Sequence, residues 1–421
     1  MLKRILTLST GMIAGSLMAM GLIHVAQLTG VLGDRAAGES ARYYRGVLEL
    51  VQERYVDPGR VVPEEMTRDA LRGMLRGLDP HSGYLAASDY EHLREDLDSK
   101  FGGIGIQIEY RDGYVIVIAP IANTPGERAG ILRGDRVLAG DGESMVGKSI
   151  NQVIDRMRGA PGTPVDVVFE RPGQEDPVEV SVNREIIKVE SVPEAMMIEP
   201  GIGYVRIAQF AEPTADESRA AIEGLLADGM ESLIIDVRNN PGGLLYSAAD
   251  VLEPFFPADE LMVYTEGRAS IDRQEFRSEN RGSIWDFPVV VLINSGSASA
   301  AEILAGALKD THRAWIVGEQ SFGKGSVQSV MQLREGEALR LTTARYYTPS
   351  GTTIHEVGVS PDEEVVMTPE DDLNVALQRN RPDLNDPVEF EERFGFAPVA
   401  DAQLEAALAY LNLLSESGDS P

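Results

Sequence analysis

The feature that most constrains the fold is a pair of short apolar runs, each of which ends in a turn of small residues. The first run, SLIIDVRNNPGG, begins at Ser232, and the second, PVVVLINSGSAS, begins at Pro288. Unbroken apolar runs of this length are typical of buried strands, and helical patterns alternate with them from Pro200 onward. Short connections between alternating strands and helices predict a mostly parallel sheet covered by helices. In such sheets functional sites gather at the carboxyl ends of the strands, where both turns lie.

Length and composition bound the remaining possibilities. A chain of 421 residues exceeds what one hydrophobic core usually serves, so two or three domains are expected. The formal net charge of −29 argues against a nucleic-acid partner, because phosphate binding needs a basic surface. The chain has no cysteine, which excludes disulfides, thiolate catalysis and cysteine-ligated zinc.

Residues 1–33 have the pattern of a signal peptide or signal anchor. The sequence begins MLKR, and no Asp, Glu, Lys or Arg then occurs from Ile5 to Gly33. A basic start before an apolar run is typical of export segments, and the run is long enough to cross a bilayer, which takes about 20 residues. We therefore expect the rest of the chain in the periplasm or on the extracytoplasmic face of the inner membrane. Whether the segment is cleaved stays open.

Two further regions flank the predicted globular domains. Residues 39–100 are expected to form an N-terminal helical region, because YYRGVLELVQERYV and EEMTRDALRGMLRGL place apolar residues at three- and four-residue spacing. Residues 371–421 are an acidic C-terminal region, and from Pro361 to the last residue there are fifteen Asp and Glu against three Arg. The apolar stretch DAQLEAALAYLNLL in this region predicts a helix, which suits either a subunit interface or packing against its own domain.

Residues 101–189 show the alternating pattern of a small β domain. The strand candidates are FGGIGIQIEY, GYVIVIAPI, RVLAGDG, PVDVVFER and PVEVSVNRE, and a short helix is expected from Thr124 to Gly130. In this order the segments resemble a PDZ domain. The resemblance implies a glycine-rich loop that captures a C-terminal carboxylate, because glycines let backbone N–H groups converge on it. The implied binding residues are Gly102, Gly103, Ile104, Gly105 and Ile106.

The serine-rich turn admits two interpretations. Ser299 and Glu302 have the spacing of a capping box, in which the serine accepts from the third helical amide and the glutamate reaches back. Alternatively, one of Ser295, Ser297 and Ser299 is a nucleophile, which requires a base. The sequence has five histidines but no GxSxG or HExxH motif, so a lysine held neutral is another candidate base. Lys324 stands between two glycines in SFGKGSVQ, which is not typical of a solvated surface lysine.

These turns together resemble the catalytic core of the carboxy-terminal processing peptidases, also called tail-specific proteases. The likeness is carried by GSASAAEILAGALKDTHRAWIVGEQSFGKGSVQ, and LDPHSGYL, the PDZ-like segment and IIDVRNNPGGLL match the family in the same order. The resemblance covers residues 40–368. It implies a multidomain α/β fold, in which a ClpP- and crotonase-like protease core at residues 190–370 carries an inserted PDZ domain.

The resemblance also implies catalytic roles for single residues. Ser299 is the implied nucleophile, Lys324 the general base and Gln328 the residue that orients the lysine. The capping interpretation of Ser299 is compatible with this role, because a helix N-terminus offers free amides and positive potential where an oxyanion develops. No metal or other cofactor is implied.

The implied oxyanion hole consists of two backbone amides. One belongs to Ala300, directly after the implied nucleophile, and the other to a glycine of the NNPGG turn. Gly242 is the favoured glycine, and Gly243 is the alternative.

Taken together, the motifs predict a serine endopeptidase of the cell envelope. Its PDZ domain is expected to bind protein substrates with apolar C-termini, and a Ser-Lys dyad to cleave them through an acyl-enzyme. A homo-oligomer is also expected, and an adaptor lipoprotein is an open question. The alternative is a non-catalytic scaffold, in which a PDZ domain accompanies a degenerate protease domain. The intact set of Ser299, Lys324 and Gln328 argues against that alternative.

Overall fold

The computed structural model describes residues 35–111, 113–121, 123–268, 273–280, 282–379, 387–394 and 396–417. The predicted export segment, residues 1–33, lies outside these ranges. Within them, no helix combines the length and the apolarity that a bilayer span requires. The chain divides into two compact units, Met1–Tyr84 and Leu85–Pro421.

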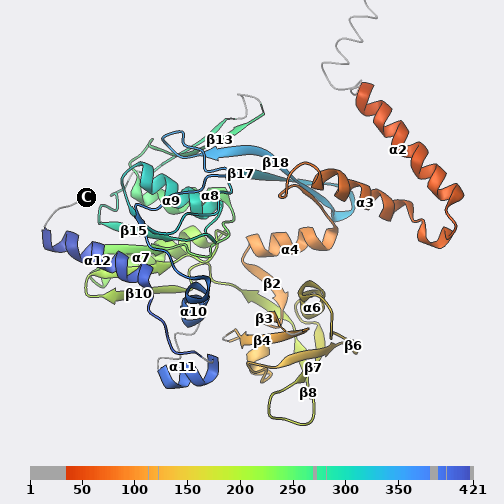
Figure 1. Cartoon of the computed structure of the whole chain (residues 1–421), viewed down its shortest axis with the longest axis horizontal. Coiled ribbons are helices and arrows are strands. Elements are labelled where there is room, and N and C mark those ends of the chain that lie inside the picture. The colour runs from red at the N-terminus through yellow and green to blue at the C-terminus, as the bar shows by residue number, and fades with distance from the viewer. Residues whose placement is uncertain are drawn as a thin grey trace, which may run out of the picture. The chain divides into compact units, whose positions relative to one another are not determined.

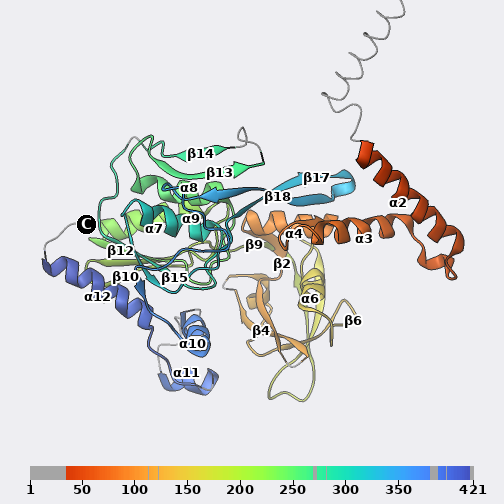
Figure 2. The same cartoon turned by 45° about the horizontal axis from the view of Figure 1, so that its top comes forward.

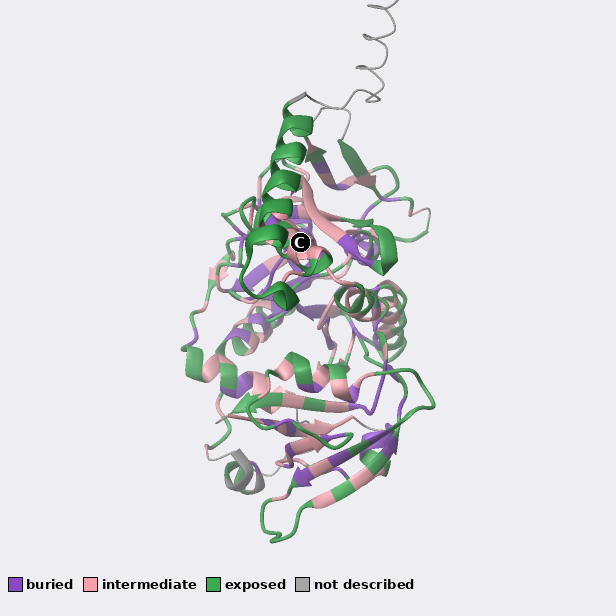
Figure 3. Ribbon diagram, turned by 90° about the vertical axis from the view of Figure 1, so that its right-hand side faces the viewer, coloured by how far each residue is buried: buried purple, intermediate pink, exposed green. Residues whose placement is uncertain are grey.

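The first unit is helical where it is described. It contains α2 (Arg35–Arg54), the 3-10 turn η1 (Pro58–Arg60) and α3 (Pro63–Arg76), and the short strand β1 (Gly83–Leu85) follows. Helix α3 begins at a proline and has two glutamates in its first turn, which suits a helix N-terminus because proline needs no amide partner there and acids favour the dipole. Helix α2 is exposed over most of its length (Figure 3). Both predicted helices are therefore present.

The second unit begins with α4 (Ala87–Leu97) and a small antiparallel domain (Figure 1). Its sheet has the order β3-β4-β5-β7-β8, and β6 pairs with β5. The strands are β3 (Ile106–Arg111), β4 (Tyr114–Pro120), β5 (Arg136–Gly140), β6 (Glu143–Ser144), β7 (Pro164–Glu170) and β8 (Val178–Asn183). The helices are α5 (Pro125–Arg128) and α6 (Ile150–Met157), and a ribbon of β2 (Lys100–Gly103) and β9 (Glu185–Lys188) joins the domain to the rest of the unit. The domain has a hydrophobic core of its own, which includes Ile104, Val117, Val137, Val153 and Phe169.

The larger part of this unit is built on a six-stranded sheet of order β10-β11-β12-β15-β16-β19. All neighbours from β11 to β19 are parallel, and only the pairing of β10 with β11 is antiparallel. The strands are β10 (Glu194–Glu199), β11 (Ile202–Arg206), β12 (Ser232–Asp236), β15 (Val289–Ile293), β16 (Trp315–Gly318) and β19 (Glu363–Glu364). The predicted mostly parallel sheet is thus confirmed. Because β12 and β15 are parallel neighbours in register, the two small-residue turns that follow them lie side by side.

Helices cover both faces of this sheet (Figure 2). One face packs against α7 (Thr214–Ala227), α8 (Leu245–Leu252) with the turn η2 (Glu253–Phe255), and α9 (Ala300–Asp310). The other face packs against α12 (Ala402–Ser417). Successive residues of β12 alternate between the layers, so that Leu233 and Ile235 join the first core and Ile234 joins the second.

A second sheet stands beside the first. Its strands are β13 (Leu261–Gly267), β14 (Gln274–Arg277), β17 (Ser326–Gln332) and β18 (Ala338–Tyr347), and β18 pairs antiparallel with both β13 and β17. The turn η4 (Arg334–Gly336) joins β17 to β18, and α10 (Pro369–Arg379) and α11 (Pro387–Phe394) precede α12. This sheet was not predicted.

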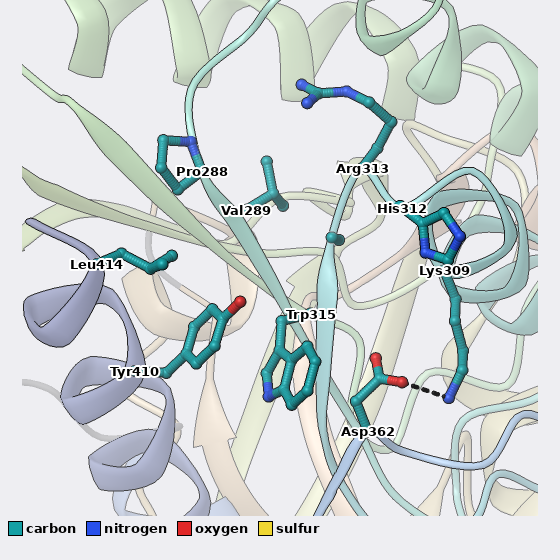
Figure 4. Close-up of a pocket in the computed structure, with 10 residues that line it drawn as sticks. Pro288, Val289, Lys309, His312, Arg313, Trp315, Asp362, Tyr410 and Leu414 are labelled. Atoms are coloured by element: carbon teal, nitrogen blue, oxygen red, sulfur yellow. Dashed lines mark ion pairs between the residues drawn. The ribbon is translucent and has the colours of Figure 1, made fainter. Parts of the chain in front are cut away.

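The C-terminal helix α12 packs against its own domain. Ala407 and Leu411 are buried on the sheet, and the ring of Tyr410 stacks on that of Trp315 at a centroid distance of 5.0 Å. Of the two uses considered for this apolar helix, packing is therefore the one observed. A cavity of about 320 Å³ lies next to the stacked rings, lined also by Lys309 and Asp362 (Figure 4). None of the predicted site residues lines it.

Candidate active site

Ser299 is the N-cap residue of α9, in a conformation that serine rarely adopts. Its φ is +56° and its ψ is −114°, whereas an N-cap residue is normally extended. A backbone of this kind costs about 1–3 kcal/mol and persists only where the surroundings enforce it. The predicted capping box is half formed: the amide of Ser299 donates to Glu302 Oε2 at 2.8 Å, but the serine side chain makes no cap hydrogen bond. The hydroxyl is thus left available for other chemistry.

The three alternating serines have different environments. Ser297 is fully buried, and its hydroxyl donates to the Val237 carbonyl at 2.8 Å and accepts from the Asn294 amide at 3.0 Å. Ser295 is exposed, and Ser299 is half-buried. Ser297 therefore links the two turns structurally. Ser299 is the remaining serine that is partly buried and whose hydroxyl forms no hydrogen bond with the backbone of the described residues.

The phenol of Tyr346, on β18, lies beside the Ser299 side chain. Burial raises the pKa of Tyr346 well above its ordinary value, and the charge of Glu302 raises it further. The nearby Ser299 side chain lowers this pKa. The geometry falls short of a hydrogen bond, and within the described residues the Tyr346 hydroxyl has no partner. A buried hydroxyl that forms no hydrogen bond is unusual in a folded protein.

Glu302 joins the serine turn to the lysine turn. Its carboxylate is completely buried and accepts four hydrogen bonds. Oε2 accepts from the amides of Ser299 at 2.8 Å and Lys324 at 2.9 Å, and Oε1 accepts from the Ser321 hydroxyl at 2.6 Å and the Gly323 amide at 2.7 Å. The backbones of Ser299 and Lys324 are thus brought to one oxygen atom. The sequence predicted Glu302 only as a helix cap.

The electrostatic surroundings of Lys324 favour its neutral form. Burial lowers the pKa of the Lys324 amine, and the charge of Arg340 lowers it further, while Glu302 opposes both effects. The glycine that follows also matters, because a Cβ atom on Gly325 would lie 2.3 Å from the amide nitrogen of His355. The predicted close backbone approach at this turn is therefore present.

The NNPGG turn contacts the serine turn at Gly242. This glycine has a φ of +96°, and a Cβ atom on it would lie 2.6 Å from Ser299 Cβ and 2.8 Å from the Ala300 nitrogen. The Gly242 amide donates to Asn240 Oδ1 at 2.8 Å. By contrast, the amides of Ala300 and Gly243 form no hydrogen bond with another residue in the described part of the chain. Of the two candidate glycines, Gly243 is therefore the one whose amide is free to bind an oxyanion in this conformation.

Gln328 lies on β17, next to a bulge in the pairing with β18. Its amide nitrogen donates to the Ser326 hydroxyl at 2.9 Å and points weakly, at 3.5 Å, to that of Thr342. No hydrogen bond joins it to Lys324 in the ranges described. The structure therefore brings Ser299, Lys324, Ala300 and Gly242 together, and places Gln328 nearby in a different hydrogen bond.

Comparison with known proteins identifies the family. The model of peptidase family S41 matches residues 201–365, and the PDZ domain model matches residues 116–171. A carboxy-terminal-processing protease of Bartonella bacilliformis is 39% identical over 356 residues, which cover 83% of this chain and 80% of that protein. The chain belongs to the carboxy-terminal processing proteases of peptidase family S41. It is therefore a serine-type peptidase with a PDZ domain.

A second curated relative of the protease agrees with this assignment. The carboxy-terminal processing protease CtpB of Bacillus subtilis is 35% identical over 331 residues, which cover 78% of this chain and 67% of that protein. Among solved structures, the photosystem II D1 C-terminal processing protease is 30% identical; the match covers 76% of this chain and 92% of that one, with a TM-score of 0.46.

The PDZ domain of the protease has a small apolar cavity at its glycine-rich loop. The cavity has a volume of about 120 Å³, and the predicted residues that line it are Gly103, Ile104, Gly105 and Ile106. Gly102 lines a neighbouring hollow instead. At Gly105 the φ is +75°, and a Cβ atom would lie 2.3 Å from Thr124, so the loop conformation requires glycine there.

Arg158 is a lining residue of this cavity that the sequence reasoning missed. Its guanidinium lies 4.5 Å from the centre of the Phe101 ring, and it forms ion pairs with Glu95 at 3.1 Å and Asp96 at 3.2 Å. An arginine at the rim of an apolar pocket offers a charged partner to a carboxylate. In the sequence it is only one basic residue near the end of SINQVIDRMRG, and the structure makes it the C-cap residue of α6.

Proposed function

We propose that the protease is an endopeptidase of the cell envelope that cleaves with a Ser299–Lys324 dyad. The observation that carries this proposal is the single Glu302 oxygen that binds the amides of both residues. A nucleophile without a histidine needs a base whose amine is neutral, and burial together with Arg340 lowers the pKa of Lys324 in that direction. The site thus combines a hydroxyl, a base and free amides in one place.

The reaction proceeds through an acyl-enzyme. Lys324 Nζ accepts the proton of Ser299 Oγ while Oγ attacks the scissile carbonyl carbon. The protonated lysine then gives that proton to the leaving amine as the C–N bond breaks, and the acyl group remains as an ester on Ser299. Water next gives a proton to Lys324 and attacks the ester, and the released serine oxygen recovers the proton. Acid–base transfer of this kind contributes about 10²- to 10⁴-fold to a rate.

Backbone amides stabilise the oxyanion. Ala300 is the first residue of α9, so its amide carries the positive potential of a helix N-terminus. The second donor comes from the NNPGG turn. Gly242 donates if the Asn240 side chain releases its amide, and Gly243 donates without any such change. Gln328 orients Lys324 in this scheme after it leaves Ser326.

The PDZ domain selects the substrate by its C-terminal tail. The cavity at Gly103–Ile106 takes an apolar terminal side chain, the glycine-rich loop with Gly102 takes the carboxylate, and Arg158 supplies a charge beside it. Strand β3 is at the edge of its sheet, so an extended tail can add to it as a further strand. The chemistry of the pocket therefore favours tails that end in an apolar residue with a free carboxylate.

Location, assembly and fold relationship complete the proposal. The protease lies in the periplasm or on the extracytoplasmic face of the inner membrane in this proposal, anchored there if residues 1–33 are retained, and the export pattern of those residues supports this location. The protease core is of the ClpP/crotonase-like type, and the protein assembles as a homo-oligomer.

One experiment tests the proposed function. The full chain and its Lys324→Ala variant are incubated with an unfolded protein whose tail ends in apolar residues, and with the same protein ending in aspartates. The proposal expects cleavage of the apolar-tailed protein alone, and only by the unaltered chain. Equal cleavage of both substrates would refute selection of the substrate by its C-terminal tail. Full activity of the Lys324→Ala variant would refute the role of Lys324 as the base.

A further inference from the structure

Arg238 is a fully buried cation directly before the NNPGG turn. Its side chain has no exposed surface, and it donates to Asp236, which is equally buried, at 2.6 Å. Burial alone would raise the pKa of Asp236, but Arg238 and Arg379 hold that pKa well below its ordinary range. Asp236 is therefore charged, and its negative charge already faces two arginines.

The second partner of Arg238 comes from the C-terminal segment. Both terminal nitrogens of the guanidinium donate to Asp401, at 2.7 and 2.9 Å, in a bidentate pair. Gln403 Oε1 accepts a further hydrogen bond from the same arginine at 3.1 Å, and the Gln403 amide donates to the Val365 carbonyl at 2.9 Å. The side chain of Asp401 is only 14% exposed, so the pair is sheltered from water. Bidentate arginine–carboxylate pairs have both strength and a defined geometry.

Asp401 has a fixed position of its own. It precedes α12, where its carboxylate accepts from the Leu404 amide at 3.1 Å and so caps the helix. Helix α12 in turn packs on the sheet that carries β12. The C-terminal helix therefore presents a rigid carboxylate to the arginine at the base of the NNPGG turn.

A second acid of the C-terminal segment contacts the other side of the site. Asp372, on α10, accepts from the Asn294 side-chain amide at 3.1 Å. The Asn294 side chain also accepts from the amides of Asn239 at 2.9 Å and Gly296 at 3.0 Å. Asn294 therefore joins the NNPGG turn to the serine turn, and α10 holds Asn294.

We propose that Asp401 is a positioning residue of the protease, with Asp372 as a second one. Through Arg238 and Asn294 they hold the two turns that present the oxyanion amides and Ser299. This inference rests on the proposed active site. Because a misplacement of reacting groups by about 1 Å can reduce a rate 100-fold, a loss of either contact acts on the chemical step. It does not act on the PDZ cavity, whose lining includes neither acid.

The inference also gives the acidic C-terminal region a specific use. Its charge excess is expected of a solvated surface. Yet Asp401 is sheltered, and it meets a buried arginine rather than solvent. Removing the charge of Asp401 would leave the buried Arg238 with Asp236 as its remaining carboxylate partner among the described residues.

The test compares Asp401→Asn with Glu405→Gln in the full chain. Glu405 is an exposed acid in the first turn of the same helix, so its variant loses the same charge without touching Arg238. The steady-state kcat and KM are measured on an unfolded protein with an apolar tail, together with the affinity for a labelled tail peptide. Asp401→Asn is expected to lower kcat roughly 10- to 100-fold, with KM and peptide affinity within about twofold. Glu405→Gln is expected to change neither constant.

A second pair keeps the inference testable if Asp401→Asn fails to fold. Asp372→Ala removes one of the two acceptors of the Asn294 side-chain amide, the other being Asn239 Oδ1. Asp371→Ala instead alters the neighbouring acid, whose carboxylate accepts from the Thr368 hydroxyl. A fall in kcat for the first and not for the second is expected. Unchanged kcat in folded Asp401→Asn, or equal losses in each variant and its control, would overturn the inference. Ser299→Ala is run alongside: if it stays active, the proposed active site fails, whereas an inactive Ser299→Ala beside a fully active Asp401→Asn refutes only the positioning role.

Discussion

The backbone amides of Ser299 and Lys324 donate to the same carboxylate oxygen of Glu302. These two residues belong to different turns, one after β15 and one after β16, and neither turn alone could fix their separation. A buried carboxylate that accepts four hydrogen bonds holds both turns. The geometry of the proposed dyad therefore depends on a residue that need not touch the substrate.

Replacing Glu302 by glutamine should destabilise the protein. The glutamine side chain has one acceptor oxygen in place of two. Its NH2 group would face N–H or O–H donors that in the unaltered protein point at the Glu302 carboxylate. Leaving such donors unsatisfied in a buried site costs about 3 kcal/mol of unfolding free energy. Urea unfolding followed by circular dichroism measures this loss. A midpoint equal to that of the unaltered chain would show that the four hydrogen bonds have little net value.

Removing the charge of Arg340 should shift the pH dependence of the reaction. Its positive charge disfavours protonated Lys324 and so lowers the pKa of the amine; without it, that pKa rises. The neutral, active form then appears at higher pH, so the rising limb of the kcat/KM profile for Arg340→Gln lies on the alkaline side of the normal one. Arg345→Gln, an exposed change on the same strand, is the control. A shift to lower pH would contradict the assignment of Lys324 as base.

A methyl group at Gly242 should disable the site. Alanine at a φ of +96° is strained, and its Cβ atom would collide with Ser299 Cβ at 2.6 Å. We expect Gly242→Ala to lower kcat by about 100-fold or more, because the turn proposed to bind the oxyanion and the proposed nucleophile Ser299 must move apart. Gly224→Ala is the matched control, since that helical glycine has no atom within 4 Å of an added Cβ and alanine favours helix by up to about 1 kcal/mol. Retained activity in Gly242→Ala would mean that this contact is absent during the reaction.

The PDZ cavity should distinguish a free carboxylate from an amide. A labelled peptide with an apolar last residue is titrated with the Ser299→Ala chain, in free-acid and amidated forms, and its fluorescence anisotropy is followed. Loss of a charge-assisted contact near Arg158 is expected to weaken binding of the amide roughly tenfold. Equal affinities for the free-acid and amidated peptides would indicate that the cavity recognises only the last side chain of the peptide and not its carboxylate.

The sequence predicted the elements with strong periodicity and missed those with weak periodicity. Strands β12 and β15 are unbroken apolar runs, and the structure has them where expected. Strands β17 and β18 mix threonine, serine, arginine and glutamine with apolar residues, as is usual for strands whose faces are only partly buried. One predicted strand, FGGIGIQIEY, is divided, because Gly105 adopts a positive φ between β2 and β3.

The residues of the candidate site that the sequence missed all act over long separations. Glu302 looked like a local cap, but three of its four donors come from residues 321–324. Tyr346 and Asp401 lie in segments without a recognisable motif and reach the site only through the packing of β18 and α12. The local sequence pattern indicates which residue types lie at the ends of strands. It does not indicate which side chains, distant in the sequence, form the hydrogen bonds that fix the positions of those residues.

The role of Ser299 as nucleophile is tested most directly by the rate of proteolysis of Ser299→Ala beside that of Ser295→Ala. Both variants remove one hydroxyl from the same turn, and only the first removes the proposed nucleophile. Cleavage of an unfolded, apolar-tailed protein is followed by gel and mass spectrometry at matched enzyme concentrations. Ser299→Ala is expected to lose activity by at least about 10⁴-fold, while Ser295→Ala stays within about twofold of the unaltered chain. Cleavage by Ser299→Ala at the normal rate, at the same bonds, would contradict the role of Ser299 as nucleophile.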